Sequence, residues 1–183
     1  MNKVKNLKIS DYIERLSSSS PTPGGGATAC IVGSFSASLI EMVCNLTLGK
    51  KNYEEFEEEI ENILDNAKKI NLKLLDLSDE DIKAFNLVME SFKLSDKKAK
   101  ETKKEEAFKK ATSVPLKVYL LTQKLETMSQ KLFEIGNKNA FSDAKSAYHL
   151  AKAAGLSALE NVSINLPYIK DSNFIKEVKA QIA

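Results

Sequence analysis

The chain has 183 residues, a length typical of one domain, and 43% of them are hydrophobic, enough to bury a substantial core. The 27 basic and 25 acidic residues leave a net charge of only +2, and Arg15 is the sole arginine, which argues against a nucleic-acid partner. One histidine and two cysteines without a Cys-x-x-Cys pair give no metal signature. We therefore expect a single helical domain over residues 1–183 with no metal site.

The first predicted helix covers residues 11–17, with Ser10 as its N-cap, and the segment before it lacks the apolar core of a signal peptide. A serine run and the loop Pro21-Thr22-Pro23-Gly24-Gly25-Gly26 follow. Two prolines stiffen this loop, and three glycines allow close backbone approach at the N-terminus of the next helix, where free N–H groups attract anions or carbonyls. It matches neither a P-loop nor a dinucleotide fingerprint. Two interpretations stay open: a ligand cradle, or a tight turn into a crowded core.

The second predicted helix covers residues 27–48 and ends before Gly49, a natural left-handed residue. It is long and apolar enough to span a bilayer, but its polar residues predict a buried helix of a bundle instead. Small residues at Ala29, Gly33 and Ala37 predict close approach of another helix. Cys30 and Cys44 would lie about 21 Å apart on this helix, too far for a disulfide, so we expect buried free thiols in a reducing cytosol.

The rest of the chain continues the helical pattern, and no segment alternates with a period of two. Apolar residues at spacings of three and four include Phe85, Phe92 and Phe108. The elements predicted here are a helix capped by Asn52 and Glu55 that runs to Leu77, a helix start at Ser78-Asp79-Glu80-Asp81, a kink or helix start at Pro115, a helix over 116–135 stopped by Gly136, a helix from Ser142 or Asp143 to about 161, and a last helix over 171–182.

Few side chains suit chemistry. Asp81 and Asp143 are candidate proton-transfer groups, although each also fits a capping role at a helix start. Lys50 and Lys51 would attract anions or simply be solvated. Two alternatives also stay open for Glu41 and Asn45, which satisfy each other or border a pocket. His149 has no partner in the sequence, so we interpret it as a structural or surface residue.

Six segments, taken in order, resemble the formiminotetrahydrofolate cyclodeaminase / methenyltetrahydrofolate cyclohydrolase family over essentially the whole chain. They are Ser20-Pro21-Thr22-Pro23-Gly24-Gly25-Gly26-Ala27, Met42 to Lys51, Asp79 to Met89, Ala111 to Leu116, Gly136 to Ala144 and Asn161 to Leu166. The resemblance implies an all-helical homodimer that acts on one-carbon tetrahydrofolates. The cyclodeaminase closes 5-formiminotetrahydrofolate to 5,10-methenyltetrahydrofolate and releases ammonia, and the cyclohydrolase interconverts methenyl- and 10-formyltetrahydrofolate with water.

The resemblance also implies roles for individual residues. Asp81 or Asp143 would be the acid/base, and Lys50 or Lys51 would meet the glutamate tail of the folate. The other residues it places at the substrate are Pro23, Gly24, Gly25, Gly26, Asn45, Phe85 and Asn165. It implies no cofactor beyond the tetrahydrofolate substrate, no metal, no nucleic-acid or membrane partner, and a cytoplasmic enzyme.

Three positions depart from the family pattern. His149 stands where the family usually has an aliphatic residue, which argues against a catalytic role for it. Lys145 stands where the family often has Gly, and Ser163 stands where it often has Arg. They motivate an alternative from another class: an inactive folate-binding or scaffolding helical dimer.

Overall fold

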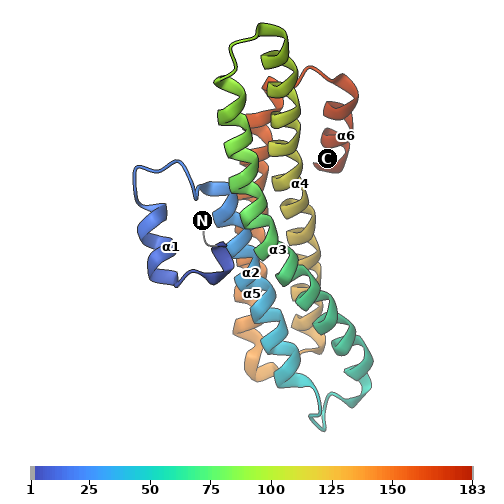
Figure 1. Cartoon of the computed structure of the whole chain (residues 1–183). Helices are drawn as coiled ribbons and strands as arrows, with labels where there is room; N and C mark the ends of the chain where they lie inside the picture. Colours follow the sequence, from blue (N-terminus) through green and yellow to red (C-terminus); the bar gives the residue numbers. More distant parts are fainter. Residues whose placement is uncertain (1–2, 183) are drawn as a thin grey trace.

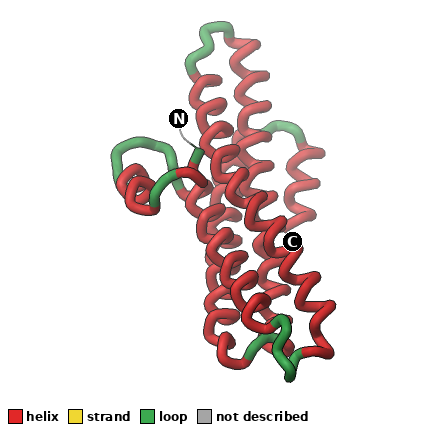
Figure 2. Tube along the Cα trace, turned by 60° about the horizontal axis from the view of Figure 1, so that its bottom comes forward, coloured by secondary structure: helices red, strands yellow, loops and turns green. Residues whose placement is uncertain are grey.

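The computed structural model describes residues 3–182, so Met1, Asn2 and Ala183 lie outside the described residues. Within that range every regular element is a helix, as Figures 1 and 2 show, which confirms the predicted all-α class. The long helices run side by side as a bundle, and α1 stands away from it (Figure 1). With 3-10 helices written η, the order is η1 (Val4–Asn6), α1 (Ile9–Leu16), α2 (Gly25–Thr47), η2 (Glu54–Phe56), α3 (Glu57–Phe92), α4 (Lys97–Ile135), η3 (Lys138–Ala140), α5 (Phe141–Asn165), η4 (Leu166–Tyr168) and α6 (Ser172–Ile182).

Helix α2 is the central helix and packs against α3, α4 and α5. A Cβ added at Gly33 would lie 3.1 Å from Leu74 Cδ1 and 3.7 Å from Ala154 Cβ, so the small residue lets α3 and α5 approach closely. This confirms the close approach predicted from the small-residue spacing and assigns the neighbours to the same chain. Among the described residues α2 alone is long and apolar enough to cross a bilayer, and its packing makes it a core helix. Cys30 and Cys44 are buried and free, as predicted.

Two helices are longer than the sequence pattern indicates. The helix start predicted at Ser78 is wrong, because α3 runs unbroken from Glu57 to Phe92. Ser78 is buried, and its hydroxyl donates to the carbonyl oxygen of Leu75 at 2.7 Å. The buried hydroxyl therefore has its hydrogen-bond partner within the same helix and does not interrupt it. A helix start at Pro115 is also wrong, since α4 continues through this proline from Lys97 to Ile135.

The helix ends are predicted better than the helix starts. Gly49 has a φ of +69°, the left-handed conformation expected after α2, and α4 ends directly before Gly136. The helix starts differ from the predicted ones. Helix α1 begins at Ile9, before the residue predicted as its cap, Ser10. Asn52 caps nothing in α3, because the 3-10 turn η2 separates the two.

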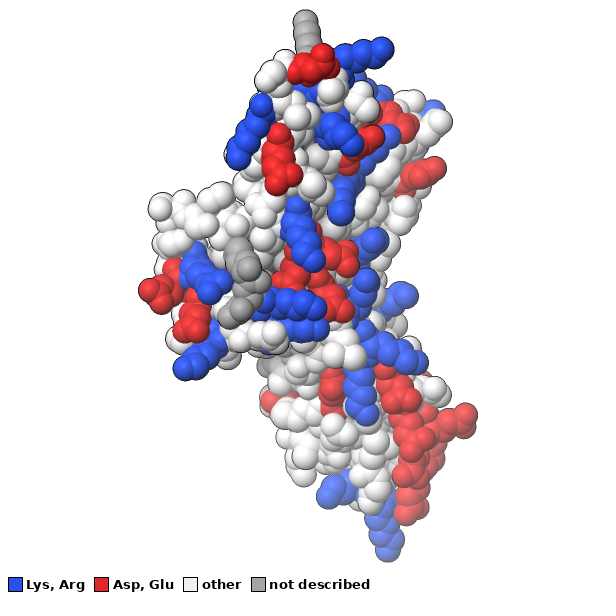
Figure 3. All heavy atoms as spheres, viewed as in Figure 1, with Lys and Arg blue, Asp and Glu red and all other residues white. Residues whose placement is uncertain are grey.

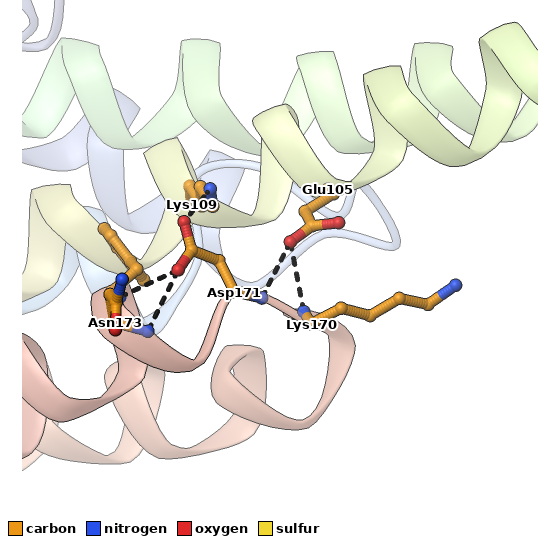
Figure 4. A network of polar contacts seen from close by, with 6 residues as sticks. Glu105, Lys109, Lys170, Asp171 and Asn173 are labelled. Atoms are coloured by element: carbon orange, nitrogen blue, oxygen red, sulfur yellow. Dashed lines mark hydrogen bonds and ion pairs between the residues drawn. The ribbon is translucent and has the colours of Figure 1, made fainter.

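The last helix is fastened to α4 by the polar network in Figure 4. The Asp171 carboxylate accepts hydrogen bonds from the backbone N–H groups of Asn173 (3.0 Å) and Phe174 (3.1 Å), and it pairs with Lys109 Nζ at 2.7 Å. Glu105 Oε1 in turn accepts from the N–H groups of Lys170 (3.1 Å) and Asp171 (2.9 Å). Because η4 precedes this network directly, the network also fixes the turn that leaves α5.

Charged side chains of both signs are interleaved on the face drawn in Figure 3. Ion pairs join separate elements, as between Lys5 and Asp76 (3.1 Å) or Lys131 and Glu59 (3.3 Å). Such exposed pairs each contribute little to stability, on the order of 0–1 kcal/mol. The stability of the bundle therefore rests on its buried apolar core.

Candidate active site

A cleft of about 390 Å³ opens between the loop that precedes α2, one face of α3, the middle of α4 and the end of α5. It brings together six of the residues predicted for the site, namely Gly24, Gly25, Gly26, Asp81, Phe85 and Asn165. Pro23 follows a cis peptide bond and is buried, and it does not line the cleft. The remaining lining residues are Pro21, Thr22, Ala84, Val88, Phe92, Phe108, Ala111, Asn161, Ile164 and Tyr168.

Asp81 lies against the first turn of α2. A Cβ added at Gly26 would be 2.2 Å from Asp81 Oδ1 and 2.8 Å from Oδ2, so the carboxyl group fills the space that any other residue at position 26 would occupy. The backbone N–H of Ala27 donates a hydrogen bond to it. Gly26 is therefore required for the close approach of a side chain to the helix N-terminus.

The surroundings of Asp81 change its acidity. Burial raises the pKa of Asp81 to about 6, and the hydrogen bond from Ala27 opposes part of that rise. A carboxyl group with such a pKa takes up and releases a proton near neutral pH, which general acid–base catalysis requires. Asp81 also lies within α3 and far from its start, so it does not cap its own helix, and the end it faces belongs to α2.

Asn165 compensates for the proline inside α4. Pro115 has no N–H, so the carbonyl oxygen of Ala111, four residues earlier, receives no helical hydrogen bond from it. Asn165 Nδ2 donates to that oxygen at 2.9 Å instead. Ala111 and Asn165 both line the cleft, so this bond holds the Asn165 amide at the site and leaves its Oδ1 as an acceptor.

The interaction is testable through stability alone. We expect Asn165→Ala to lower the free energy of unfolding by about 1–2 kcal/mol, because the Ala111 carbonyl loses its donor. In a Pro115→Ala background the restored N–H donates to that carbonyl, so the same substitution is expected to cost clearly less. Urea unfolding of the four proteins measures the difference, and equal costs in both backgrounds would contradict the proposed compensation.

Sequence reasoning missed part of the cleft. Phe92 and Phe108 were interpreted as members of an apolar stripe, and Asn161 and Tyr168 were not singled out. In the structure Asp81, Phe85, Val88 and Phe92 lie on one face of α3, at spacings of four, three and four residues. The sequence did carry one signal of this cleft, because Asp81 has the helical spacing of the apolar residues that follow it.

Comparison with known proteins identifies the chain's relatives. A family model described as formiminotransferase-cyclodeaminase matches residues 8–183. The chain belongs to this family. It is 37% identical over 177 residues to a methenyltetrahydrofolate cyclohydrolase from Methylorubrum extorquens, covering 94% of this chain and 85% of that protein. It is 26% identical over 183 residues to the mouse formimidoyltransferase-cyclodeaminase, covering 97% of this chain but only 34% of that longer protein.

The fold of this formiminotransferase-cyclodeaminase family member also matches a solved structure. The crystal structure of formiminotetrahydrofolate cyclodeaminase from Thermotoga maritima superposes with a TM-score of 0.91 at 37% identity, covering 97% of this chain and 87% of that one. That structure therefore shares the helical bundle described above.

The other residues predicted for the site lie elsewhere in the chain. Asn45 is exposed near the end of α2, and Lys50 and Lys51 are exposed in the loop after it. Asp143 is in the first turn of α5, about 27 Å along that helix from Asn161. Asn137 joins these segments, since its Nδ2 donates to the Leu46 carbonyl at 2.7 Å. The site residues predicted from the sequence thus form two groups at opposite ends of α2 and α5.

Two further predicted polar residues have plain structural roles. Glu41 Oε1 accepts a hydrogen bond from Asn71 Nδ2 at 2.8 Å, which links α2 to α3. His149 is exposed, and its ring meets that of Tyr148 edge to face at 5.6 Å. The interpretation of His149 as a surface residue is therefore confirmed.

Proposed function

We propose that the chain is a folate one-carbon enzyme. It closes 5-formiminotetrahydrofolate to 5,10-methenyltetrahydrofolate with release of ammonia, hydrolyses 5,10-methenyltetrahydrofolate to 10-formyltetrahydrofolate, or does both. Membership of the formiminotransferase-cyclodeaminase family supports this substrate class. The single observation that carries the assignment is a carboxyl group with a pKa of about 6, held at the helix N-terminus inside a cleft large enough for a ligand.

For ring closure, N10 of the folate attacks the formimino carbon and the amine leaves that carbon. Holding N10 beside the carbon supplies much of the rate, since the attack is then intramolecular. The departing nitrogen receives the proton that N10 loses and a second proton from the protonated Asp81, so that ammonia leaves, the methenyl cation forms and the carboxylate remains. The next proton from solvent restores the acid.

For hydrolysis, the Asp81 carboxylate takes a proton from the water that attacks the methenyl carbon. The C–N5 bond then breaks as Asp81 returns its proton to N5, the hydroxyl group of the adduct loses its proton to solvent, and the formyl group stays on N10. Both reactions need only proton transfers and addition to carbon, so we propose that neither uses a metal or a second cofactor. Polar groups that could hold the folate at this end of the cleft include Asn165 Oδ1, the Asn161 side chain and the amides of the three glycines, Gly24 to Gly26.

Two assays of the purified protein test this function. Ammonia release from 5-formiminotetrahydrofolate reports the cyclodeaminase, and loss of 5,10-methenyltetrahydrofolate absorbance above its spontaneous rate reports the cyclohydrolase. Turnover in at least one assay is expected. Folate binding without turnover of either substrate would favour the inactive folate-binding dimer instead.

We propose that the working unit is a homodimer joined through α2. Phe35, Leu39, Met42 and Leu46 follow one another at spacings of four, three and four residues, and three of them are among the exposed large hydrophobic side chains. An exposed apolar stripe of this kind fits an interface between copies. A two-fold axis that crosses the stripe at right angles to α2 pairs the two α2 helices antiparallel and uses the same surface on both copies.

This arrangement would also unite the two groups of predicted site residues. With the axis near the middle of the stripe, residues 50 and 51 of one copy lie opposite residues 30 and 31 of the other. That position is within about two helical turns of Gly25. The end carrying Asn45, Lys50, Lys51 and Asp143 then approaches the cleft of the second copy near Gly25, at the end of the cleft that holds Asp81.

Substituting the stripe tests the dimer. Met42→Glu is expected to convert a dimer of about twice 20.3 kDa into a monomer, because it places a charge in each half of the apolar contact. Light scattering after size exclusion measures the mass, and Leu72→Glu, at an exposed apolar residue of α3, is the matched control. A wild-type protein that is monomeric throughout the micromolar range would overturn the proposal.

A further inference from the structure

The two ends of the cleft differ in chemical character. From Asp81 one face of α3 continues along the cleft through Phe85 and Val88 to Phe92, a distance of about 16 Å at 1.5 Å per residue. The end at Asp81 is polar, with three glycine amides and the Asn161 and Asn165 side chains. The end at Phe92 is aromatic. A ligand that spans the cleft must therefore be polar at one end and must carry a ring or chain that suits aromatic contact at the other.

Three rings from different elements form the aromatic end. Phe108 of α4 stacks on Tyr168 of η4 with centroids 4.4 Å apart and an interplanar angle of 15°. Phe92 of α3 meets Phe108 edge to face at 6.4 Å. Phe92 and Tyr168 remain 43% and 49% exposed, so part of their ring surface is free to contact a ligand ring.

The ammonium group of Lys104 lies close to all three rings of this cluster. Its Nζ lies 4.8 Å from the Phe92 centroid, 5.9 Å from that of Phe108 and 5.3 Å from that of Tyr168. The lysine is half-buried, and none of the ion pairs between described residues includes it. Its neighbours differ, because Lys103 pairs with Glu106 at 3.4 Å and Lys109 pairs with Asp171 at 2.7 Å. The rings thus hold an ammonium group that has no carboxylate of its own.

We propose that this end of the cleft binds an aryl amide carrying a carboxylate, with the aryl ring against Phe92 and Tyr168 and the carboxylate at Lys104. The inference rests on the proposed function, under which this group is the p-aminobenzoylglutamate half of the folate. The substrate then lies along α3 with its one-carbon unit at Asp81 and its glutamate at the tip of the α3–α4 hairpin. Lys104 recognises the glutamate within the same protomer, without Lys50 or Lys51.

Binding calorimetry tests the contact independently of turnover. The probes are 5-formyltetrahydrofolate and the primary amide of 5-formyltetrahydropteroate, called the pteroate below, which keeps the aryl amide but lacks the glutamate and its carboxylates. Wild-type protein is expected to bind the folate roughly two- to fivefold more tightly than the pteroate, the range for one partly screened ion pair. Lys104→Gln is expected to raise the Kd of the folate to that of the pteroate and to leave the pteroate unchanged.

Two further variants separate charge from stacking. Lys103→Gln removes the same charge one residue away, and it is expected to keep the folate-to-pteroate ratio of the wild type. Phe92→Leu is expected to weaken both probes by a similar factor, since both carry the aryl ring. Thermal unfolding of each variant confirms that it is folded.

The outcomes distinguish this inference from the function on which it rests. If the wild type turns over a folate substrate but Lys104→Gln keeps the wild-type Kd ratio, the assignment of Lys104 is wrong and the function stands. If turnover is absent while the ratio depends on Lys104, the subsite stands and the catalytic assignment fails. Failure of both probes to bind would overturn the subsite.

Discussion

Replacing Asp81 with Asn is expected to lower kcat by about 100-fold or more, within the range usual for losing a positioned general acid or base. The amide has the shape of the carboxyl group and still accepts from the Ala27 N–H, but it cannot exchange a proton. Wild-type kcat/KM is expected to change with pH around pH 6, the pKa of Asp81, and this inflection should be absent from the variant. Steady-state rates between pH 4.5 and 8.5 measure both effects. A variant that keeps wild-type kcat would remove Asp81 from the chemistry.

The same substitution is expected to stabilise the fold, which separates catalysis from damage. The pKa of Asp81 is raised from 3.8 to about 6 on folding, so the native state binds its proton more tightly than the unfolded state does. Stability from this group is therefore complete below about pH 4 and is lost as the pH rises through 6. At pH 7 the ionised carboxylate lowers the free energy of unfolding by up to about 3 kcal/mol. The Asp81→Asn substitution should recover this stability. The Tm gain should vanish near pH 4, and a Tm loss at pH 7 would show that the charge is stabilising.

Gly26→Ala is expected to remove activity almost as completely while leaving the fold intact. The new methyl group would lie 2.2 Å from Asp81 Oδ1, so the carboxyl group must leave the helix N-terminus. The helix itself gains from the substitution, since alanine is favoured over glycine in a helix by about 1 kcal/mol. We expect kcat to fall by about 100-fold, with a Tm within a few degrees of the wild type.

Gly25→Ala is the matched control for this clash. A Cβ at that position meets only Asn161 Nδ2 at 3.6 Å, an ordinary contact, so Asp81 stays in place. The pH inflection near 6 should survive in Gly25→Ala and disappear in Gly26→Ala. In the Asp81→Asn background, Gly26→Ala should cost little further activity, because both changes disable one group. Additive losses would mean that Gly26 acts on something other than Asp81.

The fold was predictable wherever a local rule had no competitor. Helix ends at Gly49 and Gly136 followed from glycine chemistry. The helix starts expected at Ser78 and Pro115 were wrong. The buried Ser78 bonds back to Leu75 within α3, and Asn165 reaches across from α5 to the carbonyl that Pro115 leaves free. A helix-breaking signal in one segment cannot reveal that another segment, 50 residues later in the sequence, compensates for it.

The candidate site was predictable in composition more than in geometry. The glycine loop, Asp81, Phe85 and Asn165 were all named from the sequence, and the structure brings them to one cleft. The sequence could not reveal why position 26 must be glycine. The space that a side chain would need there is filled by the carboxyl group of Asp81, 55 positions later in the chain. The aromatic end stayed hidden because Phe92 and Phe108 have the spacing of core residues. Their partner Tyr168 lies in a turn that α6 fixes from outside the bundle.

The two buried thiols of α2 can report local opening of the bundle around this helix, because they react only when they are exposed. Burial raises the pKa of both cysteines, that of Cys44 to about 12, so neither thiol reacts with an alkylating reagent until the surrounding helices separate. Cys30 lies near the end of α2 that faces Asp81, and Cys44 lies near the other end, about 21 Å away. Their separate labelling rates would therefore give the local opening free energy at each end of the central helix, and ligand binding should slow labelling first at Cys30.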